Sequence, residues 1–140
     1  MNMILHPLAR ILVASIFIIS GLGKIFGFAP TAEMMGNVGF PAPEFFLIGA
    51  IAFELFGGLS LILGFQTRIG AGLLIIFVIL ATLIFHAPFI TDAARGQAEI
   101  VQTLKNLAIL GALVKFWIDG AGAFALDNLS VVNFTKHAEA

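Results

Sequence analysis

The sequence has no cysteine and few charged residues. The absence of cysteine excludes disulfides, thiolate metal sites and thiol redox chemistry carried out by this chain itself. Only 11% of the 140 residues are charged, whereas about 25% is usual in soluble domains. The net charge is −1, with no basic stripe and no polybasic tail, so nucleic acid is not an expected partner.

Hydrophobic residues are in excess. They make up 60% of the chain, and its mean hydropathy is +1.08. A chain of this composition cannot cover its surface with polar groups in water, but a lipid bilayer removes that requirement. We therefore expect an integral membrane protein that forms one domain over residues 1–140.

Four long apolar runs predict four membrane-spanning helices, which is an all-α, four-helix bundle in the membrane. Each run is close to the about 20 residues that a helix needs to cross about 30 Å of hydrocarbon. None shows the alternation typical of a membrane β-barrel. The first run is interpreted as a retained helix and not as a cleaved signal peptide. The helices are expected at approximately residues 8–26, 45–65, 69–86 and 100–118.

The connections predict how these helices are joined. Residues 65–68 are few enough for a tight turn, so the second and third helices are expected to form an antiparallel hairpin. The loops at 27–44 and 87–99 are longer, and a short helical turn is expected at Thr31–Met35. Cationic residues are more frequent on the side of the two termini, with Arg10 as an anchor there, which predicts that both termini are cytoplasmic.

Glu54 is the most informative polar residue, because it lies near the middle of the second apolar run. A charge at that depth costs roughly 2.5–3.5 kcal/mol even on lenient insertion scales. Gly57, Gly58 and Leu61 follow on the same helix face, and small residues allow another helix to approach closely. We therefore predict that Glu54 faces a neighbouring helix and is protonated, paired or beside a wet cavity.

Further polar groups are expected near Glu54, in the half of the bundle away from the termini. They are Lys24 on the first helix, His86 on the third, and Lys105 and Asn106 on the fourth. These five residues are the candidate cofactor-binding cluster, with Glu54 and Lys105 as candidate catalytic residues. No metal site is expected, since the three His residues are scattered and none has helix-ligand spacing.

Each member of this cluster also has a purely structural interpretation. Lys24 can extend to the lipid headgroups, His86 can be an interfacial residue, and Asn106 can bond across helices. Glu54 and Lys105 can form an ion pair that only fixes the register of the helices. The 15 Phe residues are interpreted as lipid-facing and packing groups.

Several short strings together carry a resemblance to a known family. They are Arg10 with SGLGK at 20–24, GFPAP at 39–43, ELFGGLSLILGFQTR at 54–68, FH at 85–86, KNLAILG at 105–111 and GAGAFALD at 120–127. Over about residues 8–129, the chain resembles the DoxX family of small bacterial inner membrane proteins. Ala121 and Ala125 replace the Pro and Ser usual in the last string, which predicts a less rigid turn there.

The resemblance implies a four-helix bundle in the bacterial inner (plasma) membrane. Some DoxX relatives are subunits of thiosulfate:quinone oxidoreductases, and others are linked to thiol, oxidative or catechol and quinone stress. We therefore expect a redox-linked subunit with quinone as its cofactor. A soluble oxidoreductase partner is expected too, since this chain has no flavin, haem or dinucleotide motif. Two alternatives stay open: an assembly protein whose polar cluster fixes helix register, and a small-solute carrier, for which a homo-oligomer would provide the room.

Overall fold

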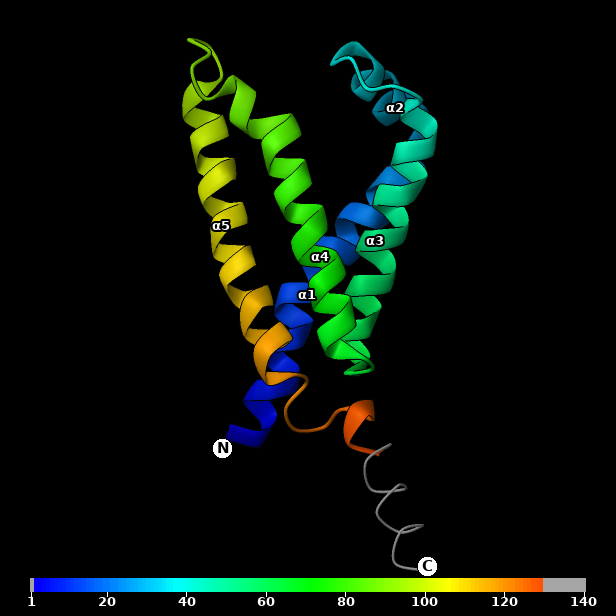
Figure 1. Cartoon of the computed structure of the whole chain (residues 1–140), viewed down its shortest axis with the longest axis vertical. Helices are drawn as coiled ribbons and strands as arrows, with labels where there is room; N and C mark the ends of the chain where they lie inside the picture. Colours follow the sequence, from blue (N-terminus) through cyan, green and yellow to red (C-terminus); the bar gives the residue numbers. More distant parts are fainter. Residues whose placement is uncertain (1, 130–140) are drawn as a thin grey trace, which may run out of the picture.

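The computed structural model describes residues 2–129 and shows a bundle of four long helices and one short one (Figure 1). Among the described residues no strand is present, and four helical segments are long and apolar enough to cross a membrane, so the predicted all-α membrane bundle is confirmed. The helices are α1 (Asn2–Phe26), α2 (Phe28–Asn37), α3 (Pro43–Leu63), α4 (Thr67–Ala81) and α5 (Gly96–Asp119). A π-helical turn, η1 (Thr82–His86), and a 3-10 turn, η2 (Ala87–Phe89), extend α4.

Local sequence explains where α3 begins and ends. Pro43 occupies the first turn, where its fixed φ suits a helix and its missing N–H is not needed. Gly64 follows the last turn with φ of 64°, the left-handed conformation that commonly ends a helix. Only residues 64–66 separate α3 from α4, so these two helices form the expected antiparallel hairpin.

The helices are arranged as two pairs that splay apart. α3 packs against α1 and α4, and α5 packs against α4, whereas α1 and α5 make few contacts with each other. The pairs α1–α3 and α4–α5 converge near the N-terminus and the end of α5, which we call the terminal end (Figure 1). They diverge toward α2 and the loop after η2, which we call the splayed end (Figure 1).

The apolar core holds the converging parts of the helices together. Its buried members come from all four long helices and are Ala14, Phe17, Leu61, Ala71, Leu74, Val78 and Leu113. Gly57 allows α4 to approach α3, because a Cβ at this position would lie 2.5 Å from Cγ of Leu74. Glu54, Gly57, Gly58 and Leu61 are all buried, as the shared helix face predicted.

The segment that follows α5 folds back and ties three helices together at the terminal end. The carboxylate of Asp127 accepts hydrogen bonds from the backbone N–H groups of Gln66 at 2.6 Å and Thr67 at 3.1 Å, and so caps α4. Arg10 of α1 donates to the carbonyl oxygen of Phe124 at 2.6 Å and is only 1% exposed. Arg10, expected to be an anchor on the cytoplasmic side, is thus enclosed by this segment of the protein.

The helices extend beyond the apolar runs. α1 begins at residue 2 instead of near residue 8, and α2 covers ten residues instead of the single turn expected at Thr31–Met35. α5 begins at Gly96 instead of near residue 100. Hydropathy marks the residues that can lie in hydrocarbon, whereas backbone hydrogen bonds continue into more polar sequence.

The loop before α5 is held by Asp92. The backbone N–H groups of Ala94 and Arg95 donate hydrogen bonds to its carboxylate, and these bonds lower the pKa of the Asp92 carboxyl.

Candidate functional site: a polar and aromatic cavity

A cavity of about 490 Å³ lies between the two helix pairs toward the splayed end. This volume is in the range of sites that bind small molecules, about 300–1,000 Å³. All five residues of the predicted cluster line it: Lys24, Glu54, His86, Lys105 and Asn106. Ser20, Thr31, Arg95 and Glu99 add further polar groups that the cluster did not include. The fold therefore brings the predicted residues around one cavity, although it does not pair them as expected.

Glu54 pairs with Lys24 and not with Lys105. Nζ of Lys24 lies 2.9 Å from Oε2 and 3.0 Å from Oε1 of Glu54, and it also donates to Oγ of Ser20 at 2.6 Å. The Glu54 side chain is 3% exposed, so the prediction that it faces a neighbouring helix is confirmed. The predicted Glu54–Lys105 pair is wrong, and so is the interpretation of Lys24 as a group that extends to the headgroups.

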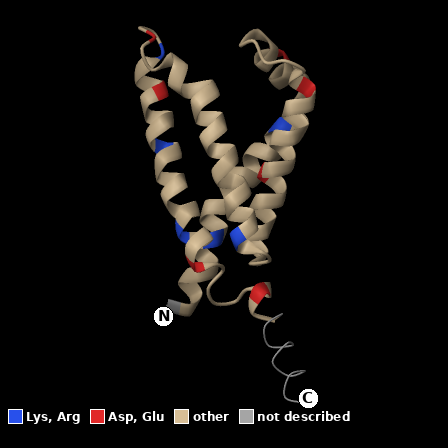
Figure 2. Cartoon of the chain, in the orientation of Figure 1, with Lys and Arg blue, Asp and Glu red and all other residues tan. Residues whose placement is uncertain are grey.

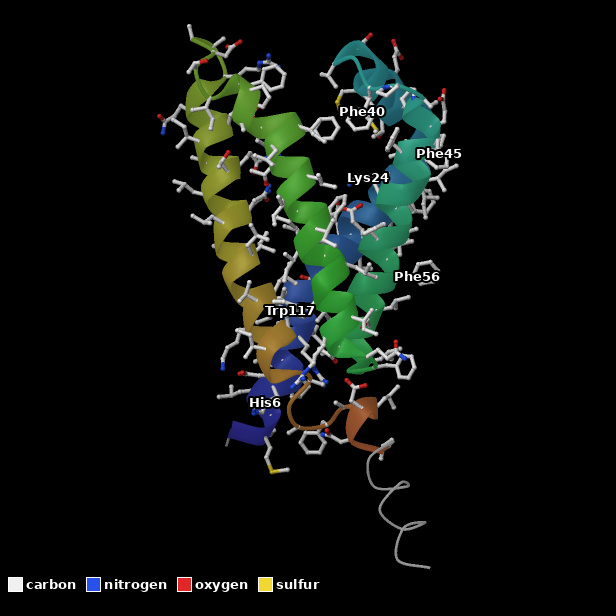
Figure 3. The ribbon with its side chains drawn as sticks, in the orientation of Figure 1. His6, Lys24, Phe40, Phe45, Phe56 and Trp117 are labelled. Carbon is white, nitrogen blue, oxygen red and sulfur yellow. The ribbon has the colours of Figure 1, made fainter. Side chains whose placement is uncertain are left out.

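The close approach of α1 to α3 explains this choice of partner. A Cβ at Gly21 would lie 2.9 Å from Cδ2 of Leu55 and 3.4 Å from Cβ of Glu54. Lys24 is three residues further along α1 and on the same helix face, so its amine reaches the carboxylate directly. Figure 3 shows Lys24 between the two helix pairs. The ion pair thus forms part of the α1–α3 wall of the cavity.

A second close contact between polar side chains lies on the other wall. Nδ1 of His86, the last residue of η1, is 2.7 Å from Oε2 of Glu99 in the first turn of α5. Both side chains are largely buried, with exposures of 24% and 16%. Glu99, expected at the end of the 87–99 loop, is therefore a site residue that was not predicted. It lies seven residues before Asn106, and hence on the same helix face, a signal that required α5 to begin earlier.

Thr82 and Asn106 join α4 to α5 at the back of this wall. The hydroxyl of Thr82 donates to the carbonyl oxygen of Val78 at 2.7 Å and accepts from Nδ2 of Asn106 at 2.8 Å. Asn106 therefore bonds across helices, one of the two interpretations left open by the sequence. Thr82 begins the π-helical turn, and such turns are frequent at functional sites.

Phe17, Phe77, Phe85 and Phe89 form part of the remaining, largely aliphatic lining, and other Phe residues face outward. Phe17 and Phe77 meet edge to face with their ring centroids 6.5 Å apart, and Nζ of Lys24 lies 5.9 Å from the Phe77 centroid, within cation–π range. Phe45 and Phe56 are exposed on the outer side of α3, as expected of lipid-facing residues (Figure 3). Among the described residues, no group of three or more His, Asp or Glu could hold a metal ion.

A second, smaller cavity of about 340 Å³ lies between α1 and α5 at the terminal end. Ala112 and Phe116 of α5 and Val13 of α1 contribute to its apolar lining, while His6 and Lys115 lie at its polar side. It contains no member of the predicted cluster. Substitutions in this smaller cavity can therefore be compared with the same substitutions in the larger one.

The fold and the cavity define a class of protein: a helical membrane protein with four spanning segments and a polar, aromatic cavity between two helix pairs. Within this class, the chain belongs to the DoxX family, whose model matches residues 6–87. It is 38% identical to Inner membrane protein YqjF of Escherichia coli (strain K12) over 121 residues, which cover 86% of this chain and 88% of that protein.

Two further relatives cover most of the chain. Inner membrane protein YphA of Escherichia coli (strain K12) is 34% identical, with 89% of each protein covered. The protein named "Putative oxidoreductase CatD" of Bacillus subtilis (strain 168) is 34% identical, with 75% of this chain and 78% of that protein covered. No solved structure matches the chain significantly. The inner membrane relatives and the four apolar helices agree on a bilayer environment.

Proposed function

We propose that this chain is a redox-linked subunit of the bacterial inner membrane that binds a quinone in the larger cavity. The observation that carries the proposal is the composition of that cavity, in which a buried carboxylate–lysine pair lies among apolar walls that include four Phe residues. A quinone needs an apolar slot for its ring and tail, and hydrogen-bond donors at its carbonyl oxygens. The cavity between the helix pairs supplies both.

The residues of the cavity can be given roles in this reaction. Reduction of a quinone to a quinol takes up two electrons and two protons, so acids beside the ring are useful. Glu54, held by Lys24, is suited to exchange protons on one wall, and His86 with Glu99 is suited to do so on the other. The electrons must come from a soluble oxidoreductase partner, because this chain has no cysteine and no cofactor motif. The oxidoreductase in the name of CatD, a relative, supports a redox role.

A pair of matched substitutions tests the proposal. The protein in lipid nanodiscs is titrated with a short-chain benzoquinone, and we expect saturable binding with one quinone per chain. Ala81→Phe fills the larger cavity and should weaken binding by at least about tenfold, since overlap with the ring costs more than about 1.4 kcal/mol. Ala112→Phe makes the same change in the smaller cavity and should leave binding unchanged.

Two outcomes would reject the quinone site. One is the absence of saturable binding to the unmodified protein. The other is equal weakening by Ala81→Phe and Ala112→Phe, which would place any bound quinone outside the larger cavity.

One observation favours the assembly protein as a second candidate. Lys24, Glu54 and Ser20 already bond to one another, so they can hold α1 against α3 without a ligand. In that case the joint replacement of Lys24 by Met and Glu54 by Leu would preserve the cellular function of the protein. A quinone-binding protein should instead lose its function on this change, even if it remains folded.

We also propose that the terminal end is cytoplasmic. Lys and Arg positions form a band across the helices at this end (Figure 2). Lys24 and Lys105 line the cavity and Arg10 is covered by protein, so they are poor indicators of orientation. Without these three residues, the side of the termini has Arg68, Lys115 and Lys136, and the opposite side has Arg95. Lys136 lies outside the described residues and is counted from its place in the sequence.

A further inference from the structure

One cation of the larger cavity has no carboxylate partner. The Lys and Arg residues in its lining are Lys24, Arg95 and Lys105. Lys24 pairs with Glu54, and Nη2 of Arg95 lies 3.6 Å from Oδ2 of Asp92. Within residues 2–129, Lys105 forms no ion pair and no side-chain hydrogen bond. Its exposed side chain is therefore available to a ligand.

The carboxylates of the cavity are already committed to other partners. Glu54 is held by Lys24 on the α1–α3 wall. Glu99 precedes Lys105 by six residues, about 9 Å along the helix axis, and its Oε2 contacts His86 at 2.7 Å. Asn106, the neighbour of Lys105, bonds to Thr82. The charge of Lys105 is thus left without a counter-charge at its own position.

The unpaired charge of Lys105 should attract an anionic ligand more strongly in this cavity than it would in water. The walls are built largely from apolar and aromatic side chains in the membrane-spanning part of the bundle. A charge pair near protein is several-fold stronger than in water, because the effective dielectric constant is about 20 instead of about 80. A ligand with one negative charge would therefore bind in preference to a neutral ligand of the same size.

We infer that the cavity takes quinones in an anionic form, in which one ionised ring hydroxyl pairs with Nζ of Lys105. This inference rests on the proposed function and narrows its substrate class from quinones in general to hydroxyquinones. The aromatic ring would lie against the walls that include Phe77 and Phe85. Its carbonyl oxygens would then face the polar groups around Lys24.

Two quinones of nearly equal size separate charge from shape. 1,4-Naphthoquinone is neutral, whereas the hydroxyl of 2-hydroxy-1,4-naphthoquinone is ionised at pH 7. Dissociation constants are measured for both with the full chain in nanodiscs of phosphatidylcholine, a lipid with no net charge. Because the chain has no cysteine, it offers no thiol that these quinones could alkylate. We expect the unmodified protein to bind the anionic quinone at least about tenfold more tightly, the effect of about 1.4 kcal/mol.

Three variants assign the preference to Lys105. Lys105→Met should abolish the preference for the anion, and saturable binding of neutral naphthoquinone, whatever its affinity, shows that the variant is folded. Lys105→Arg keeps the charge and should retain the preference. Lys115→Met removes a cation from the same helix outside the larger cavity and should change neither affinity.

The possible failures are distinguishable. Equal affinity of the unmodified protein for the two quinones, or a preference that survives Lys105→Met, would overturn the inference and leave the quinone site standing. If neither quinone binds, the proposed function itself fails, and the inference fails with it.

Discussion

Glu54 and Lys24 are placed by contacts that their own sequence neighbourhoods do not reveal. The depth of Glu54 in an apolar run was enough to predict that it is sheltered from lipid. Four basic or amide residues, on three other helices, were available as partners: Lys24, His86, Lys105 and Asn106. Lys24 is the partner because Gly21, one turn before it, allows the α1 backbone to lie close to α3 and Glu54. The carboxylate therefore sits at a helix interface and at the wall of a cavity at once.

At the residue scale, we predict that removing one partner of this pair is costly and that removing both is not. Lys24→Met leaves the carboxylate of Glu54 buried without a counter-charge and should lower the free energy of unfolding by about 3–5 kcal/mol. The joint change of Lys24 to Met and Glu54 to Leu should recover most of this loss. Denaturation in detergent, followed by circular dichroism, measures both.

Lys115→Met is the control for this pair, because Lys115 and Asp119 form an exposed ion pair on α5. Its effect should stay within about 1 kcal/mol. A loss for Lys24→Met no greater than that of Lys115→Met would show that Lys24 does not stabilise Glu54.

At the scale of elements, α3 is the central helix, and its glycines differ in what surrounds them. Gly57 faces Leu74 of α4, and Gly58 faces Ile18 of α1, where a Cβ would lie 2.8 Å from Cδ1. Gly49, earlier in the same helix, would place a Cβ with no heavy atom within 4 Å. The same residue type thus serves helix packing at one end of α3 and has no packing role nearer its start.

We predict opposite effects of alanine at these two positions. Gly57→Ala forces the methyl group into Leu74 and should lower the free energy of unfolding by about 1–3 kcal/mol. Gly49→Ala adds a methyl group in open space and should raise it by up to about 1 kcal/mol, since alanine favours helix more than glycine does. Thermal unfolding of both variants in the same detergent gives the comparison. Equal effects at the two positions would refute the close α3–α4 contact.

At the scale of the whole molecule, the bundle is closed at one end and open at the other. The segment after α5 closes the terminal end, where Asp127 caps α4 although it lies sixty residues further along the chain than Thr67. The left-handed Gln66 before α4 makes no side-chain cap of its own. At the splayed end, the two helix pairs diverge around the larger cavity (Figure 1).

The arrangement of the ends leads to a topology prediction. Alkaline phosphatase fused after Ala140 should be inactive in bacterial cells, because its disulfides do not form in the cytoplasm. The same reporter inserted in the loop between η2 and α5, at the other end of the bundle, should be active. An active C-terminal fusion together with an inactive loop fusion would reverse the proposed orientation.

The amino-acid sequence was enough to predict the four spans, the buried face of α3 and the candidate polar residues, because hydropathy and helical spacing are local properties. It located Lys24, Glu54, His86, Lys105 and Asn106, all of which line the larger cavity. It did not determine which of them pair, that Glu99 contacts His86, or that the segment after α5 covers Arg10. Those outcomes depend on where helix backbones approach each other, and only the tertiary structure sets those distances.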